Sequence, residues 1–310
     1  MGIVVIGAVF VDVKGYPEGT YIPGGRNAGS VEYTHGGVGR NVAEDIANVE
    51  LRPTLVSLVD TTGGGMDVIN KLKNHKVNTD YIRAVRNGMG TWLAVFDSNG
   101  DVTASISQRP DLTPMVNILD EQGDEIISNA DSIILEIDIE KEIVKRTFAL
   151  AKKYNKKVYA VVSNMSIALE RRDFFQSLDC FVCNRQEAGM MFYDDYEGKK
   201  PEEMVEIISE RVRSARIPSM IVTLGADGAV YADMKGQKGW CPARKVEVRD
   251  TTGAGDAFCA GAVIGLTHGK TMEEACRIGS TLSASVITTY DSVCPRFQPR
   301  ELGLDIDVVD

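Results

Sequence analysis

The chain has 310 residues, of which 44% are hydrophobic and 25% charged, a composition typical of a globular protein rather than a disordered or fibrous one. Its formal net charge is −10 and basic residues are interleaved with acidic ones, which argues against nucleic acid as a partner. The opening run MGIVVIGAVFVDV has no basic leader and is too short to span a bilayer, so we expect a buried strand and a cytoplasmic protein without a membrane partner.

Short runs rich in β-branched residues alternate with helical patterns along most of the chain. Strands are predicted at 3–11, 54–59, 132–137, 158–162, 180–183 and 220–224. Helices are predicted at 38–49, 66–75, 140–154, 201–215, 254–268 and 272–289. This alternation predicts an α/β fold, a doubly wound and mostly parallel sheet flanked by helices, which we treat as one domain over 1–310.

Two stretches interrupt the alternation. Residues 13–37 are rich in glycine and proline, and residues 90–109 resemble two strands around an Asn99-Gly100 turn. Because such strands lie near the ends of core strands, we expect lid segments at approximately 13–35 and 90–109, which form a small β-strand lid. Surface hairpins without a lid role are the alternative. Trp92 and Tyr33 lie in these segments and could stack on a base or simply pack the hairpins.

Carboxylates follow two of the predicted core strands, at the edge where open α/β sheets bind their ligands. Asp12 closes the first strand, where a carboxylate can accept hydrogen bonds from two neighbouring sugar hydroxyls or form a turn. Glu136 and Asp138 end the strand IILEID, and the sequence does not separate them as substrate ligands.

The stretch DTTGAGDAF (250–258) places small residues at the start of a predicted helix. The backbone N–H groups of Gly253, Ala254, Gly255 and Asp256 would lie at its N-terminus, where unpaired donors and the helix dipole attract an anion. Such an anion hole can hold a phosphoryl group in transfer. Asp256 could then accept the proton of an attacking hydroxyl, or its charge could simply favour the first helical turn.

The longer stretch DTTGAGDAFCAG (250–261) matches the C-terminal signature of the ribokinase-like, or PfkB, family of carbohydrate and nucleoside kinases. GGVGRNVAEDIA (36–47) resembles the first glycine signature of this family, CNRQEAG (183–189) its N-x-x-E motif, and VTLGADGAVY (222–231) its T-x-G-x-x-G turn. The motifs occur in the family's order along the chain. The resemblance implies a ribokinase-like fold and an ATP-dependent kinase that phosphorylates a primary hydroxyl of a sugar or nucleoside.

The resemblance also implies roles for individual residues. Asp256 is expected to be the general base, with Gly253, Ala254 and Gly255 as the anion hole. Substrate binding is expected from Asp12, Gly37, Arg40, Asn41 and Glu136, and ATP binding from Asn184, Thr223, Gly225 and Gly228. Asn184 and Glu187 are expected to position Mg²⁺ largely through water, although alone they could equally be a helix cap and a first-turn acid.

A monovalent cation and a second subunit are further expectations from the family. Asp250 and Thr252 match positions that support such a cation in several relatives. The downstream stretch ITTYDSVCP (287–295) departs from the family's small-residue pattern, which argues against potassium dependence. Lid strands of this family often pair between subunits, so we expect a homodimer through the lid.

The substrate is sought in GGVGRN (36–41). Ribokinases tend to have GGKGAN there, whereas pseudouridine kinases of the family have G-G-V-x-R-N, so conversion of pseudouridine to pseudouridine 5′-phosphate is expected. Ribokinase-type, fructokinase-type and purine nucleoside kinases are the alternatives, and Arg40 could instead be a structural guanidinium. A catalytically inactive sugar-binding regulator would have a damaged anion hole or base, and both are intact.

Overall fold

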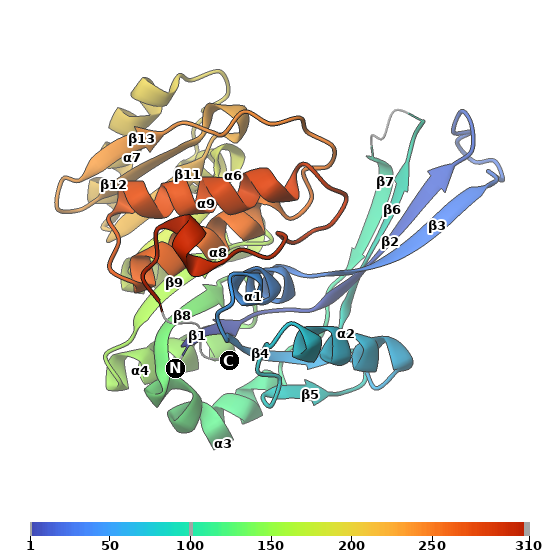
Figure 1. Ribbon diagram of the computed structural model, residues 1–310, viewed down its shortest axis with the longest axis horizontal. Coiled ribbons are helices and arrows are strands. Elements are labelled where there is room, and N and C mark those ends of the chain that lie inside the picture. Colours follow the sequence, from blue (N-terminus) through green and yellow to red (C-terminus); the bar gives the residue numbers. More distant parts are fainter. Residues whose placement is uncertain (1, 99–101, 307–310) are drawn as a thin grey trace.

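The computed structural model describes residues 2–98 and 102–306, and these residues form two β-sheets (Figure 1). The larger sheet has the order β13-β12-β11-β10-β9-β8-β1-β4-β5. Its strands are β1 (Gly2–Ile6), β4 (Thr54–Val59), β5 (Ile82–Ala84), β8 (Ala130–Glu136), β9 (Lys157–Val161), β10 (Cys180–Asn184), β11 (Ser219–Thr223), β12 (Ala229–Asp233) and β13 (Lys238–Cys241). Neighbours from β5 to β11 are parallel, while β12 and β13 are antiparallel. The predicted doubly wound, mostly parallel sheet is confirmed.

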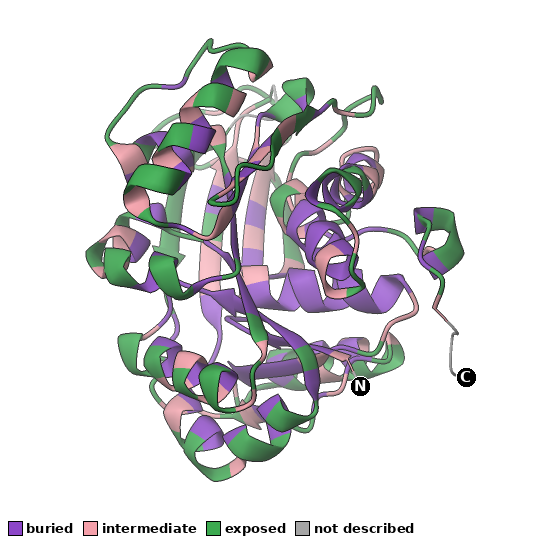
Figure 2. Ribbon diagram, turned by 90° about the vertical axis from the view of Figure 1, so that its left-hand side faces the viewer, coloured by how far each residue is buried: buried purple, intermediate pink, exposed green. Residues whose placement is uncertain are grey.

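Helices cover both faces of the larger sheet, and their buried sides face it (Figure 2). One face carries α1 (Val38–Asn48), α2 (Gly63–Asn74), α8 (Ala254–Thr267) and α9 (Met272–Val286). The other carries α3 (Met115–Ser128), α4 (Lys141–Lys153), α5 (Met165–Ala168), α6 (Arg185–Phe192) and α7 (Pro201–Ala215). Alternate residues of the central strands β1, β8, β9 and β10 belong to opposite cores, which is why these strands are largely apolar runs in the sequence. No helix in the described parts of the chain is long and apolar enough to cross a membrane.

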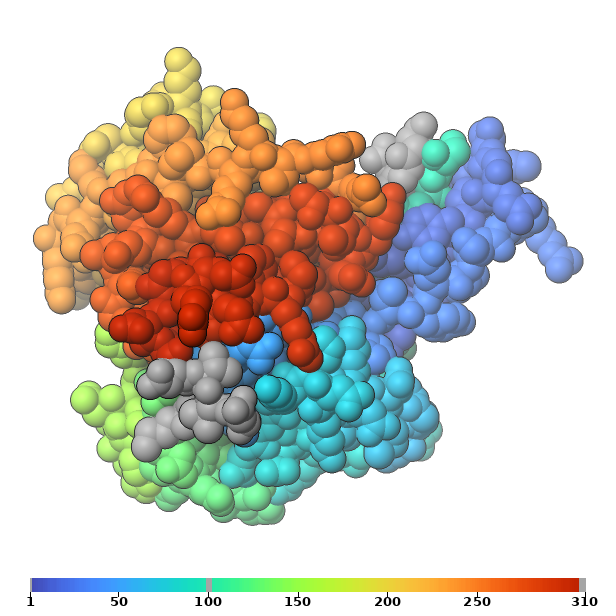
Figure 3. All heavy atoms as spheres, in the orientation of Figure 1, coloured from blue at the N-terminus to red at the C-terminus, as the bar shows by residue number. Residues whose placement is uncertain are grey.

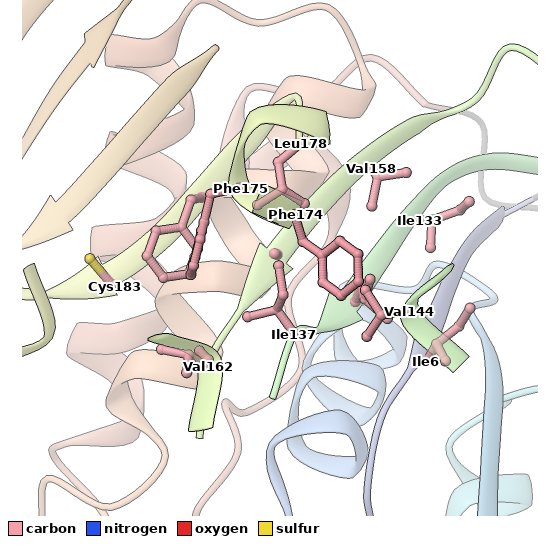
Figure 4. Close-up of a cluster of buried hydrophobic side chains, with 14 of the residues drawn as sticks. Ile6, Ile133, Ile137, Val144, Val158, Val162, Phe174, Phe175, Leu178 and Cys183 are labelled. Carbon is pink, nitrogen blue, oxygen red and sulfur yellow. The ribbon is translucent and has the colours of Figure 1, made fainter. Parts of the chain in front are cut away.

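The core on the α3–α4 face extends across several strands (Figure 4). Ile6, Ile133 and Val158 come from β1, β8 and β9 and lie on the same face of the sheet. Phe174 and Phe175, from the short helical segment Leu169–Ser177, pack into the same cluster. This packing fixes the sheet whose strand ends carry the candidate site.

The second sheet has the order β3-β2-β6-β7 and projects from one side of the core (Figures 1 and 3). Its strands are β2 (Phe10–Pro17), β3 (Gly29–Gly36), β6 (Gly90–Phe96) and β7 (Val102–Gln108). They fall mostly within the two segments expected to interrupt the α/β pattern. The expected Asn99-Gly100 turn lies outside the described residues.

The strand predicted at 3–11 is wrong in one respect, because it is two strands in two different sheets. β1 ends at Ile6, and β2 begins at Phe10. Between them, Gly7 packs against the start of α1, where a Cβ on Gly7 would lie 2.9 Å from the Cα of Gly39. This close approach of the helix ends the core strand and directs the chain into the second sheet.

The direction of chain progression changes between β1 and β8. From β1 the chain proceeds to β4 and β5 on one side, and then returns to β8 and continues to β11 on the other. Ligands of open parallel sheets bind beyond the carboxyl ends of the strands at such a switch point. The crevice after Ile6 and Glu136 is therefore the place to look for a site.

Candidate active site

The N-terminus of α8 lies at this crevice and begins with a strained glycine. Gly253 has φ 80°, and a Cβ there would lie 2.0 Å from the carbonyl oxygen of Ser292, so only glycine fits. The amide of Ala254 donates to the Thr251 carbonyl at 3.2 Å, and the first helical bond runs from Ala257 to Gly253. The anion hole is therefore narrower than expected, because the Ala254 amide is already engaged. The amides of Gly255 and Asp256 lie in the first turn, where they can meet an anion.

Asp256 is held at the crevice by a side chain from a distant part of the sequence. Its Oδ2 accepts a hydrogen bond from Nδ2 of Asn41, on α1, at 2.7 Å. Burial raises the pKa of Asp256 to about 6, although the Asn41 hydrogen bond and the Arg40 charge act in the opposite direction. The carboxylate is thus fixed in direction and ionised at neutral pH, with a pKa suited to a general base.

Asn41 has a second polar atom that points to a ligand. Its side chain is buried, and Oδ1 has no hydrogen-bond partner among the described residues. Since a buried carbonyl oxygen without a partner is unfavourable, Oδ1 is suited to accept a bond from a substrate hydroxyl. The structure therefore brings Asn41 into the site as a partner of Asp256, which the sequence did not reveal.

Asp12 lies on β2, on the side of the second sheet that faces Asp256. It is almost fully buried, and burial raises its pKa, while the charges of Lys14 and Arg40 act to lower it. Gly36 makes room for it, because a Cβ there would lie 2.4 Å from Asp12 Oδ1. Asp12 also raises the pKa of Asp256 through its charge, which places the two carboxylates in one crevice.

Arg40 makes its contacts in the interior of the protein, and its expected role in substrate binding stays a prediction. Its side chain is 0% exposed, and Nη1 donates to Glu44 Oε2 at 2.7 Å. Nη2 donates to the carbonyl of His35 and to Ser292 Oγ. The guanidinium therefore joins β3, α1 and the 292 segment, which is the structural alternative considered for it. Gly37 is also structural, since it caps α1 with φ 95°.

The two carboxylates after β8 differ in their partners. Glu136 Oε2 accepts from the Ala8 amide at 2.8 Å, and burial together with the nearby Asp138 raises the pKa of Glu136 to about 8. Asp138 accepts from Ser163 Oγ at 2.7 Å and from Arg109 Nη1 at 3.1 Å. Both side chains are nearly fully buried. Asp138 is occupied by the loop after β9 and by Arg109, so Glu136 remains the one predicted substrate ligand of the pair.

Asn184 and Glu187 form a capping box at the start of α6. Asn184 Oδ1 accepts from the Glu187 amide, and Glu187 Oε2 accepts from the Asn184 amide, both at 2.8 Å. Burial raises the pKa of Glu187, and the charges of Asp138 and Asp256 raise it further. Within residues 2–98 and 102–306, no three His, Cys, Asp or Glu side chains converge as metal ligands. The donor set suits Mg²⁺ that keeps most of its water.

Asp250 and Thr252 are bound to each other. The amide and the hydroxyl of Thr252 both donate to Asp250 Oδ1 at 2.8 Å. Asp250 Oδ2 lies 3.9 Å from the ammonium of Lys14, on β2. These residues do not fit a monovalent cation at the Asp250 carboxylate, because a protein cation already lies beside it.

A cavity of about 600 Å³ opens beside the N-terminus of α8. Thr223, Gly225 and Gly228, three of the expected ATP-binding residues, line it together with Gly255 and Phe258. Asn184, the fourth, does not line it. The walls of the cavity are largely apolar, which suits a purine ring. Because Gly255 lines the cavity, a triphosphate attached to such a ring would reach the first turn of α8.

An aromatic cluster lies on the face of the second sheet that carries Asp12. Trp92 pairs directly with Asp12 in the register of β2 and β6. Phe96 stacks on Tyr16 with ring centroids 4.8 Å apart, and the ring of Trp92 meets Phe96 edge-on. Tyr33, the other aromatic residue considered for stacking, is 73% exposed on the opposite face. Tyr16, Phe96 and Lys14 escaped the sequence analysis, although strand alternation from Asp12 places 14 and 16 beside it.

The comparisons with known proteins match this chain to kinases. A family model described as pfkB family carbohydrate kinase matches residues 2–295. Guanosine-inosine kinase of Exiguobacterium acetylicum is 31% identical over 292 residues, which cover 94% of this chain and 95% of that protein. Pseudouridine kinase of Escherichia coli K12 is 24% identical over 287 residues, 92% of this chain and 90% of that protein. The solved structure of Arabidopsis thaliana ribokinase complexed with ribose and ATP has a TM-score of 0.83 at 21% identity, and the match covers 97% and 98% of the two chains.

Proposed function

Because the chain belongs to the pfkB family of carbohydrate kinases, we propose that it is an ATP-dependent nucleoside kinase that phosphorylates the 5′-hydroxyl of its substrate. The observation that carries the proposal is the Asn41–Asp256 pair at the N-terminus of α8, between the cavity and Asp12. In this proposal Asp256 is the base, the amides of Gly255 and Asp256 are the anion site, and Asp12 is the carboxylate that binds the substrate hydroxyls.

The residues would act in sequence on the attacking hydroxyl. Asp12 and Asn41 Oδ1 orient the ribose, and Asp256 accepts the proton as the 5′-oxygen attacks the γ-phosphorus in line. The bond from the γ-phosphorus to the β–γ bridging oxygen breaks, and ADP leaves. The amides of Gly255 and Asp256 then stabilise the charge on the transferred group. Asn184 and Glu187 would hold Mg²⁺ through water, and the ion would neutralise charge on the phosphates of ATP.

The aromatic cluster supports a nucleoside over a free sugar. Trp92 and the stacked Tyr16–Phe96 pair lie next to Asp12 on the same sheet face, so a base attached to a ribose held by Asp12 would meet aromatic rings. A free sugar would leave these rings without a partner. The second sheet is proposed to act as the lid that brings this face over the substrate.

Guanosine and inosine are the first candidates, since the relative at 31% identity acts on them by its name and is matched along nearly its whole length. Pseudouridine is the second candidate, favoured by GGVGRN and by the relative at 24% identity. The pseudouridine signature depends on Arg40, whose side chain is fully buried and held by Glu44, His35 and Ser292. This residue therefore reads no base directly and gives little weight to pseudouridine.

A substrate panel tests the proposal. We expect the highest kcat/KM for guanosine or inosine when ATP consumption is measured in parallel with pseudouridine, uridine, adenosine, ribose and fructose. Trp92→Ala is expected to lower kcat/KM for the nucleoside by about 5- to 150-fold, because stacking contributes about 1–3 kcal/mol per base. Turnover of ribose by the same variant serves as the control and should change little. Equal or better turnover of a free sugar by the wild type would overturn the nucleoside assignment.

The opposite face of the second sheet supports the expected homodimer. Each of the four strands contributes one residue to an apolar row that lies side by side in register: Tyr33, Val13, Leu93 and Ile106. Ile106 is 68% exposed. An exposed apolar row on a projecting sheet is typical of an interface. We propose that a second copy of this chain covers it.

Light scattering during gel filtration tests this pairing. The wild type should elute as a dimer and Leu93→Glu/Ile106→Glu as a monomer, because carboxylates on this face resist burial against a second copy. Met66→Glu, at an exposed apolar residue of α2, is the matched control and should remain dimeric. A monomeric wild type would contradict the proposed interface.

A further inference from the structure

Lys14 is a buried lysine that the mechanism described so far does not use. It lies on β2 two residues after Asp12, so both side chains are on the same face of the strand. Only 6% of the residue is exposed, and its ammonium lies 3.9 Å from Asp250 Oδ2. Lysine is rarely buried to this degree unless its charge is matched.

The crevice around Lys14 has an excess of negative charge. The charge of Asp12 raises the pKa of Asp256, that of Asp256 raises the pKa of Glu187, and ATP would add a triphosphate. The nearby guanidinium groups of Arg40 and Arg109 are held by carboxylates, Glu44 and Asp138, and are directed to structural contacts.

The ion pair of Lys14 with Asp250 is longer than a hydrogen bond. At 3.9 Å, the ammonium can retain Asp250 as a counterion and still direct N–H groups at a further acceptor. Asp250 stands three residues before Gly253, at the entrance to the first turn of α8. Strand β2 of the second sheet therefore positions the remaining N–H groups of Lys14 at the edge of the anion site.

We propose that Lys14 supplies the fixed positive charge beside the anion hole: its ammonium neutralises Asp250 and binds the phosphoryl group in transfer. This inference rests on the proposed kinase function. Thr252 donates to Asp250 Oδ1, and the Lys14 ammonium lies 3.9 Å from Oδ2, so the lysine takes the place of a monovalent cation beside that carboxylate. The enzyme should then work without potassium.

Steady-state kinetics of Lys14→Met and Lys14→Arg test the role of the charge. With the best substrate of the panel, kcat of Lys14→Met should fall on the order of 10²-fold, the loss typical for one group that stabilises transition-state charge. The KM for the nucleoside should change little, and Lys14→Arg should retain more activity than Lys14→Met. Lys76→Met, at a more exposed lysine paired with Glu50, is the matched control and should keep wild-type kcat.

The same assays in potassium, ammonium and choline chloride at equal ionic strength separate this role from a structural one. The wild type should be equally active in all three salts, whereas Lys14→Met should recover part of its kcat in ammonium or potassium and none in choline. Unfolding midpoints of the variants show whether they fold.

The outcomes separate the two proposals. A wild type that needs potassium, or a folded Lys14→Met with normal kcat, would overturn the role of Lys14 and leave the kinase proposal intact. Loss of kcat in Lys14→Met without cation recovery, and equal loss in Lys14→Arg, would also overturn it. A wild type inactive on every member of the panel would overturn the kinase proposal, and this inference with it.

Discussion

Replacing Asp256 with Asn is expected to lower kcat by about 10²- to 10⁴-fold, because the amide cannot accept the proton of the attacking hydroxyl. Nucleoside affinity should be nearly unchanged, since the loss occurs in the transition state. Single-turnover phosphoryl transfer and equilibrium binding by calorimetry measure the two quantities separately. Asp173→Asn, at an exposed carboxylate, is the control. Near-normal turnover by Asp256→Asn would contradict the general-base role.

The dependence of kcat/KM on pH is an independent test of Asp256 as the general base. Burial raises the pKa of Asp256 to about 6, and only the ionised carboxylate can accept a proton, so activity should fall as the pH decreases through about 6. An aspartate in water would place this limb near pH 4. In Asn41→Ala the carboxylate loses a hydrogen bond that favours its charged form, so the limb should move to higher pH. A limb that stays in place in this variant would show that Asn41 does not tune the base.

Replacing Arg40 with Met is expected to destabilise the fold by about 3–5 kcal/mol, because Glu44 is left charged and buried without its closest partner. Lys71 Nζ, 3.2 Å from Glu44 Oε1, limits the loss to the lower part of this range. Urea unfolding measures the effect. The double variant Arg40→Met/Glu44→Gln should recover part of the stability, since the unpaired charge is removed.

Arg277→Met is the matched control for Arg40→Met. Arg277 pairs with Glu273, also four residues apart on a helix, but the two side chains are 69% and 49% exposed. Exposed pairs contribute about 1 kcal/mol or less, so this variant should unfold almost like the wild type. Equal losses of unfolding free energy in the two arginine variants would show that the buried Arg40–Glu44 pair stabilises the fold no more than an exposed pair.

Much of the fold could be predicted because its strands are buried on both faces. The run TLVSLV at 54–59 is mostly apolar, and β4 has these bounds. Helix α3 was not predicted, although Ile118, Leu119, Ile126 and Ile127 form one buried stripe. Pro114 precedes it without a capping side chain, and Gly123 interrupts it, so the usual signals for a helix are weak.

The break after β1 was not predictable for a different reason. Residues 3–11 have the composition of one continuous strand, and nothing local marks an end at Ile6. The end is imposed by the approach of Gly39 to Gly7, a contact between segments 32 residues apart in the numbering. Tertiary contacts of this kind override strand propensity and are invisible to a local pattern.

In the candidate site, too, residues within a local motif could be predicted, whereas contacts between distant segments could not. Asp256 and the glycines before it were predicted from a motif, because an anion site at a helix start needs small residues in sequence. The partnership of Asn41 with Asp256 and that of Lys14 with Asp250 join segments that are far apart in the chain, and no spacing predicts them. Arg40 shows the converse, since a residue inside a signature motif is structural.

The placement of the two tryptophans gives this protein a pair of separate optical reporters. Trp92 lies on the second sheet opposite Asp12, whereas the Trp240 indole donates to the carbonyl of Asp227 in the turn between Gly225 and Gly228. Binding at the proposed ribose site should therefore alter the fluorescence of Trp92, and binding in the proposed nucleotide cavity that of Trp240. With Trp240→Phe and Trp92→Phe as single-tryptophan proteins, the order in which the two ligands bind becomes readable from intrinsic emission alone.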